Sequence, residues 1–197
     1  MNTKKPMSSL QKCFYAVSFI VLIAAFVFLG TKNYKIKELS DAEQFSREYR
    51  TVSSDNLFQV FDSAEALTFL EKGTGILFLG FPDNKWSSSI AEMLDQVSHE
   101  YNYPVNYFNF YDERENRHDN YLGILTEVDE YLNLDDKGRL NLYAPTIIGV
   151  VKGDVIYFDD ETTFMNQKME PSDYWTPSQK EKKMLRLRSL FLEMKGK

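Results

Sequence analysis

The chain of 197 residues carries 23 Lys and Arg side chains, 29 Asp and Glu side chains and one cysteine, Cys13. A single cysteine excludes an intrachain disulfide, a CxxC redox pair and a cysteine-rich zinc site. Residues 1–37 hold six lysines and no acid, so the rest has 17 basic and 29 acidic side chains, a net charge of −12. Such a domain repels nucleic acid, and the length suits one globular domain plus an extension.

An uncharged stretch, CFYAVSFIVLIAAFVFLGT, covers residues 13–31 between Lys12 and Lys32. At about 1.5 Å per residue, a helix of this length spans almost the whole of a bilayer core of about 30 Å. We therefore predict one transmembrane helix over 13–31, preceded by a cytoplasmic tail of residues 1–12. A cleaved signal peptide is the alternative, although no A-x-A site follows the apolar run.

The lysines on the two sides of this stretch are nearly balanced in number, so the positive-inside rule decides little. A short tail, one span and a large following domain are the usual layout of a signal anchor that exports its domain. We therefore expect a single-pass protein of the cell membrane with its C-terminal domain extracytoplasmic.

Residues 32–56 are polar with little apolar period, and they predict a stalk or a short helix. A domain over 57–197 follows. It opens with a short alternating strand at 57–61 and a helix at 62–73, with an N-cap at Asp62 and a terminal glycine. The next segment, TGILFLGF, is a continuous apolar run, as expected for a central strand buried on both faces.

The second half of the domain predicts a helix at 89–101, a strand at 105–111, a helix at 121–134 and a final helix at 177–194. Between these helices, APTIIGVVKGDVIYFDDE predicts two strands joined as a hairpin. The element order is β-α-β-α-β-α-β-β-α. Right-handed crossovers make the first strands parallel, whereas the last two are antiparallel.

The C-terminal segment differs in charge from the rest of the domain. Residues 180–197 hold seven basic and two acidic side chains. This charge contrast predicts that the basic segment lies against the acidic body, and a solvated helix face is the alternative.

Two motifs carry a resemblance to a known family. GFPDNKWSSS follows the central strand at residues 80–89 and opens a helix, and YAPTIIGVVKGDVI comes much later, at 143–156. Together with FDDET and the YW pair before the last helix, they resemble thioredoxin-like proteins of the group that includes bacteriocin-transport accessory proteins of Gram-positive bacteria. The resemblance implies an α/β, thioredoxin-like fold, with a central mixed sheet flanked by helices and a cis peptide bond before Pro145 that faces the site.

In that group the turn reads like GFPxCPWC, which places the two redox cysteines on Asn84 and Ser87. Both thiols are missing here. An amide cannot attack a disulfide, and an unactivated hydroxyl cannot replace the resolving thiol. Because Asn is among the best N-cap residues, we predict that Asn84 keeps the start of the helix without the chemistry.

Neither serine catalysis nor metal binding finds the residues that it needs near this turn. A serine nucleophile at 87–89 needs a base, but His99 lies about three turns along the same helix and His118 lies in a charged loop. The acidic groups at 159–161 and 135–136 do not match a calcium-loop spacing. We therefore predict no catalytic residue, no metal and no cofactor.

Side chains and backbone groups suited to binding remain at the turn. The edge beside Ala144 and Pro145 can pair with an extended peptide, Phe81 and Trp86 can supply apolar contact, and Lys85 at the helix start favours an anion. Trp86 is either a packed residue or an exposed anchor. The candidate residues of a degenerate, partner-binding site are Phe81, Asn84, Lys85, Trp86, Ser87, Ala144 and Pro145.

The sequence therefore predicts a membrane-anchored, extracytoplasmic, redox-inactive thioredoxin-like domain. Its expected role is that of a binding or accessory module for an exported peptide or a membrane protein complex. Three alternatives stay open: a thiol–disulfide oxidoreductase relative with residual or partner-supplied activity, a structural subunit of a secretion or envelope assembly, and a decayed enzyme in which only the fold persists.

Overall fold

The computed structural model describes residues 39–163 and 168–197, together with Ser8, Ser9, Gln11, Tyr15, 17–19 and Val21. Residues 1–38 and 39–197 form two separate units. Among the described residues, no helix is both long and apolar enough to cross a membrane. Most of the predicted transmembrane stretch, 13–31, lies outside the described residues.

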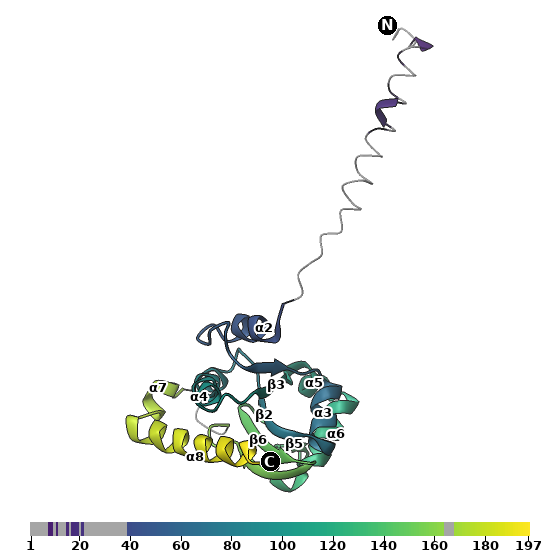
Figure 1. Cartoon of the computed structure of the whole chain (residues 1–197). Coiled ribbons are helices and arrows are strands. Elements are labelled where there is room, and N and C mark those ends of the chain that lie inside the picture. Colours follow the sequence, from purple (N-terminus) through teal and green to yellow (C-terminus); the bar gives the residue numbers. More distant parts are fainter. Residues whose placement is uncertain are drawn as a thin grey trace. The chain divides into compact units, whose positions relative to one another are not determined.

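The unit of residues 39–197 is a mixed α/β structure in which helices flank a five-stranded sheet (Figure 1). Its described elements, in chain order, are α2 (Asp41–Glu48), β1 (Phe58–Val60), α3 (Ser63–Lys72), β2 (Thr74–Gly80), α4 (Lys85–Tyr101), β3 (Val105–Asn109), α5 (Tyr111–Asn116), α6 (Asp119–Glu127), the 3-10 turn η1 (Asp129–Tyr131), β4 (Asn133–Leu134), β5 (Leu140–Asn141), β6 (Thr146–Val151), β7 (Asp154–Asp159), α7 (Pro171–Tyr174) and α8 (Pro177–Lys195).

The strand order in the main sheet is β1-β3-β2-β6-β7. Strands β1, β3 and β2 are parallel, and β6 and β7 each run antiparallel to their inner neighbour. This arrangement confirms the predicted parallel first half and antiparallel final hairpin. Strands β4 and β5 form a separate two-stranded ribbon between α6 and β6.

Strand β2 lies in the middle of the sheet and is buried on both faces, as its continuous apolar sequence predicts. Ile76 and Phe78 face one core with α4 and α8, whereas Leu77 and Leu79 face a second core with α3 and α6. The alternation follows from the strand period of two. Figure 1 shows the two helix pairs on opposite sides of the sheet.

Gly153 fixes the conformation of the β6–β7 turn, which is the turn of the predicted hairpin. Its φ of 88° lies in the left-handed region that favours glycine. A Cβ atom at this position would lie 2.3 Å from the carbonyl oxygen of Glu71, at the end of α3. The N–H of Gly153 also donates to the Gly73 carbonyl, so the turn packs directly on the end of that helix.

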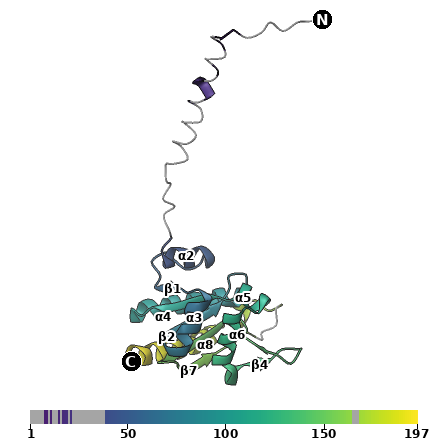
Figure 2. The same ribbon diagram turned by 90° about the vertical axis from the view of Figure 1, so that its right-hand side faces the viewer.

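Residues 32–56, predicted as a stalk or a short helix, do contain a short helix, α2, but the compact unit begins at Leu39 rather than at Leu57. Helix α2 packs beside β1 (Figure 2), and Phe45 and Tyr49 are buried in the core. Phe45 stacks on Phe58 with ring centroids 3.7 Å apart. Phe45 lies on α2, whereas Tyr49 and Val52 follow its end, so these buried side chains are scattered among polar residues and give the sequence no clear apolar period.

Two other predicted boundaries are also wrong. The helix predicted at 121–134 ends at Glu127, because Asn133 and Leu134 pair with β5 instead. The strand predicted at 105–111 ends at Asn109, and the charged segment after it forms α5. The final helix, α8, closely matches its predicted range.

Helix α8 is joined to the acidic body by ion pairs, which confirms the prediction from the charge contrast. Lys183 is only 1% exposed, and its Nζ lies 2.7 Å from Asp159 and 3.4 Å from Glu161. Arg188 pairs with Glu100 at 2.7 Å. Burial raises the pKa of Asp159, but attraction and hydrogen bonding by Lys183 outweigh burial and hold the pKa below its usual value.

We expect Lys183→Met to lower the free energy of unfolding by about 3 to 5 kcal/mol at pH 7, because it leaves the Asp159 carboxylate buried without a cation. Urea denaturation followed by circular dichroism measures this loss. The neighbouring substitution Lys182→Met, at an exposed position, should change stability by less than about 0.5 kcal/mol.

The pH dependence gives a second test of the same pair. A depressed folded-state pKa stabilises the protein above the usual Asp pKa of about 3.9, and this contribution is lost as the pH falls through the folded-state pKa. The stability difference between wild type and Lys183→Met should therefore shrink as the pH falls below about 4. A difference that is independent of pH would show that lost packing, rather than the charge pair, causes the effect.

Candidate functional site

The start of α4 is built around the side chain of Asn84. Its Oδ1 atom accepts hydrogen bonds from the N–H of Trp86 at 2.8 Å and of Ser87 at 3.1 Å. These N–H groups are among those that a helix leaves without an internal partner. Asn84 is therefore the N-cap of α4, as predicted, and the helix begins at Lys85 rather than at Ser89.

The same side chain also reaches the segment before β6. The Nδ2 atom of Asn84 donates to the carbonyl oxygen of Ala144 at 3.1 Å, across 60 positions of sequence. The peptide bond between Ala144 and Pro145 is cis, which confirms that prediction. The two segments meet because Thr146, at the start of β6, pairs with Leu79 near the end of β2, from which α4 leaves the sheet.

Trp86 is packed, so its interpretation as an exposed anchor is wrong. It is 5% exposed, and its ring meets the edge of Tyr174 with centroids 5.7 Å apart. The neighbouring Trp175 donates from Nε1 to Ser89 Oγ at 3.1 Å, and Ser89 Oγ donates to the Trp86 carbonyl. Helix α7 and the residue after it therefore cover the first turns of α4.

Lys85 and Ser87 have different environments, although both belong to the first turn of α4. Lys85 forms an ion pair with Glu170 at 2.7 Å. Ser87 is fully buried, and among the described residues its hydroxyl has no hydrogen-bond partner. A Cβ atom at Gly80 would lie 3.0 Å from the Tyr49 hydroxyl and 3.1 Å from that of Ser87, so only glycine fits between them. Ser87 is a core residue beneath the site and does not face a ligand.

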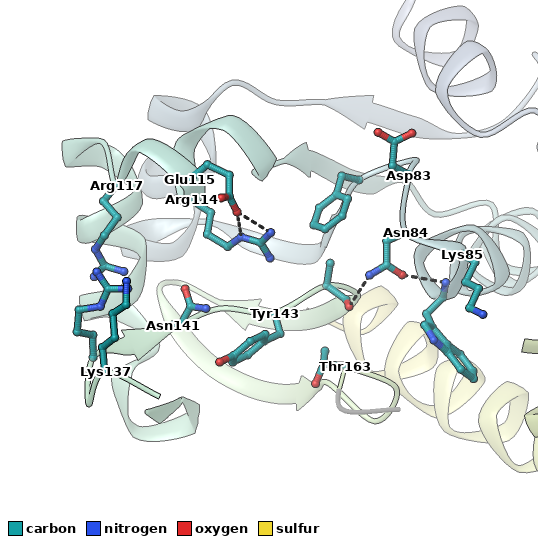
Figure 3. Close-up of a pocket in the computed structure, with 14 residues that line it drawn as sticks. Asp83, Asn84, Lys85, Arg114, Glu115, Arg117, Lys137, Asn141, Tyr143 and Thr163 are labelled. Atoms are coloured by element: carbon teal, nitrogen blue, oxygen red, sulfur yellow. Dashed lines mark hydrogen bonds and ion pairs between the residues drawn. The ribbon is translucent and has the colours of Figure 1, made fainter. Parts of the chain in front are cut away.

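A cleft of about 830 Å³ opens beside Asn84 (Figure 3). Five of the predicted site residues line it, whereas Ser87 and Pro145 do not. The other lining residues come from the turn before α4, from α5, from the β4–β5 ribbon and from the segments after β5 and β7. The complete lining consists of Phe81, Asp83, Asn84, Lys85, Trp86, Arg114, Glu115, Arg117, Lys137, Arg139, Asn141, Tyr143, Ala144 and Thr163.

One end of the cleft is cationic, and Arg114, Arg117, Lys137 and Arg139 define this cationic end. Figure 3 shows Arg117 and Lys137 at the end opposite Asn84 and Lys85, with Arg114 between them. The Arg114 guanidinium also lies over aromatic rings, 5.1 Å from the Phe81 centroid. Cations outnumber carboxylates among the lining residues, although the domain as a whole is acidic.

Two of these cations are oriented by carboxylates. Arg114 donates from Nε and Nη2 to Glu115 at 3.1 and 2.9 Å, and Arg139 donates in the same way to Asp135 at 3.0 and 2.8 Å. Hydrogen bonds from the Arg139 side chain and from the backbone lower the pKa of Asp135 to about 2. In the part of the chain that the structure describes, neither Arg117 nor Lys137 forms an ion pair with a carboxylate.

The lining residues include no cysteine and no histidine. His99 lies 3.5 Å from Asp95 on α4, and His118 pairs with Glu113, so neither is placed to activate a serine in the cleft. Within residues 39–163 and 168–197, and in the few described residues before them, no three His, Cys, Asp or Glu side chains could hold a metal ion. The arrangement can bind an anionic or polar group.

The cationic end was not predicted from the sequence. Arg114 and Arg117 belong to the charged run DERENRHDN, and Lys137 and Arg139 belong to the turn DDKGR. Both segments are typical of solvated loops, because each mixes the two signs of charge. The spacing of the arginines by three residues was the only signal that they lie together, although Arg117 proves to be the left-handed C-cap of α5 and not part of the helix.

Comparison of the chain with protein-family models, with curated proteins and with solved structures finds no match. The function of the cleft therefore has to be inferred from its residues and geometry. Three features enter that inference: the two-way hydrogen bonding of Asn84, the cis bond before Pro145 and the cationic end.

We expect Asn84→Ala to lower the free energy of unfolding by about 1 to 3 kcal/mol, because it removes the N-cap and the bond to Ala144 together. Asn84→Asp should cost less, since a carboxylate is an equally good N-cap and is favoured at a helix N-terminus. Urea denaturation at pH 7 compares the two variants. Equal losses would mean that the contact with Ala144, and not the cap, fixes the start of α4.

Proposed function

We propose that this chain is a membrane-anchored binding module whose thioredoxin-like domain has lost thiol–disulfide chemistry and binds a partner in the cleft beside Asn84. Its partner is an exported peptide or a membrane protein complex, for which it serves as an accessory protein. The observation that carries the proposal is the hydrogen bond from Asn84 to Ala144. This bond joins the helix start to the cis-proline segment without any thiol.

The strand order supports the thioredoxin-like assignment. Three parallel strands followed by an antiparallel hairpin, with a cis-proline opening β6 beside the N-terminus of α4, is the arrangement that the resemblance implies. The positions that the resemblance assigns to the redox cysteines are Asn84 and Ser87. Asn84 is a cap and Ser87 is a buried hydroxyl, which supports a site that has kept its shape and lost its reaction.

The apolar segment supports a membrane anchor. Tyr15, Val17, Phe19 and Val21 are helical, and each exposes more than half of its side chain. Exposed apolar side chains in an uncharged stretch of this length favour a bilayer over water. Under the proposed export layout, the domain of residues 39–197 lies outside the cytoplasm.

A binding role accounts for more of the site than the alternatives do. A structural subunit or a decayed enzyme does not require an open cleft of about 830 Å³ with oriented guanidinium groups. Such a volume lies within the usual range for ligand sites, about 300 to 1,000 Å³. An oxidoreductase would need its partner to supply every thiol at the site, because the only cysteine is Cys13.

We expect the full chain neither to catalyse the reduction of insulin by dithiothreitol nor to oxidise a dithiol peptide above the rate without protein. The reason is that no thiolate is available at the helix start to form a mixed disulfide. Turbidity and thiol titration measure the two reactions. A clear rate in either assay would overturn the redox-inactive assignment.

The variant Asn84→Cys with Ser87→Cys is the matched control for this assay. The N-terminus of α4 should lower the pKa of a thiol at position 84, so we expect the pair to react with an oxidant and to form a disulfide. Wild type and the double variant should have the same circular dichroism spectrum. A folded double variant without a reactive pair would show that the turn no longer has the geometry of a redox site.

We expect protease added to intact cells to degrade the domain from residue 39 onward and to leave the N-terminal tail protected. Epitope tags at the two ends of the chain, followed by immunoblotting, distinguish the fragments. Detergent-permeabilised cells serve as the control, in which both tags should be lost. Protection of the C-terminal tag in intact cells would place the domain on the cytoplasmic side.

A further inference from the structure

The cationic end of the cleft points to the class of ligand. We infer that the cleft binds an extended acidic peptide whose carboxylates reach Arg114, Arg117, Lys137 and Arg139 while its backbone lies beside Ala144; this inference rests on the proposed function. The four cations come from two separate segments: Arg114 and Arg117 from α5 and its C-cap, and Lys137 and Arg139 from the turn between β4 and β5. Figure 3 shows Arg117 and Lys137 at one end of the cleft, with Arg114 between that end and Asn84.

The guanidinium groups retain donors for a ligand. An arginine has five N–H donors, and Arg114 and Arg139 each direct only Nε and Nη2 toward a carboxylate of their own chain. Glu115 and Asp135 therefore hold the two guanidinium groups in place and leave their Nη1 atoms for another acceptor. A guanidinium group that is already oriented binds a carboxylate well, because it loses less side-chain entropy on binding than an unrestrained arginine does.

Arg117 and Lys137 add charge that no acidic group of the described chain neutralises through an ion pair. Arg117 donates from Nη1 to the Leu140 carbonyl at 3.5 Å, and its guanidinium lies 5.9 Å from the centre of the Tyr121 ring. Both contacts hold the side chain beside the ribbon without cancelling its charge. The cationic end thus has an excess of positive charge in the region where a ligand would lie.

The domain's negative net charge sharpens this selectivity. An acidic ligand is repelled by most of the surface, and that repulsion is screened beyond about 8 Å at physiological salt. A ligand in the cleft comes within contact distance of all four cations. Charge therefore favours an acidic segment at this place.

The other end of the cleft favours a peptide over a simple anion. Among the described residues, the Ala144 N–H donates no backbone hydrogen bond, so this group is a candidate donor to a ligand carbonyl. Phe81 and Ala144 supply apolar contact in the same cleft. An extended peptide directs alternate side chains to opposite sides, so it can pair with the backbone and still present its carboxylates on one side.

The test uses the full chain in neutral detergent and a fluorescein-labelled peptide of about eight residues, in which Glu alternates with Val. Fluorescence anisotropy should show tighter binding of this probe than of the same peptide with Gln in place of Glu. The double variant Arg117→Asn with Lys137→Gln should weaken binding of the Glu peptide by about 3- to 30-fold. Asn suits position 117 because its φ is 49°.

The matched control is Lys72→Gln with Lys182→Gln, which removes the same charge from exposed positions outside the cleft. It should leave the affinity for the Glu peptide unchanged. Equal binding of the Glu and Gln peptides, or equal losses in the cleft variant and the control, would overturn the acidic-ligand inference. Inorganic phosphate should not compete at similar concentrations. If phosphate displaced the probe with an inhibition constant equal to the probe's dissociation constant, the ligand would be a simple anion, and the acidic-peptide inference would be overturned.

A photoreactive version of the Glu peptide separates this inference from the proposed function. Mass spectrometry should locate its cross-links on the residues that line the cleft. If the Gln peptide gave cross-links at the same positions and with the same yield, the cleft would remain a binding site. The preference for acidic ligands would then be refuted. Cross-links elsewhere, or no binding of either peptide by a chain with a native circular dichroism spectrum, would refute both proposals.

Discussion

Asn84 forms hydrogen bonds in two directions, and the geometry of the cleft depends on them. Its oxygen satisfies two N–H groups at the start of α4, while its nitrogen binds the carbonyl before the cis-proline. A primary amide is suited to this position because it has both an acceptor and donors on one rigid plane. The hydrogen bond to Ala144 fixes the distance between the start of α4 and the segment before β6. Residues of both segments line the cleft.

Several parts of the fold could be predicted because local chemistry determines them. The burial of β2 follows from its unbroken apolar sequence, the cap at Asn84 follows from its side-chain type, and the contact of α8 with the body follows from opposite charge. In each case one short segment contains its own signal. The cis bond before Pro145 was predicted instead from the resemblance.

Other parts could not be predicted because their cause lies far away in the sequence. Helix α2 contributes the buried ring of Phe45 to the core, and the aromatic ring that stacks on it, Phe58, belongs to β1. Trp86 could be assigned as packed only once Tyr174 was known to lie beside it. The cationic end combines two loops whose mixed charges look solvated when each is considered alone.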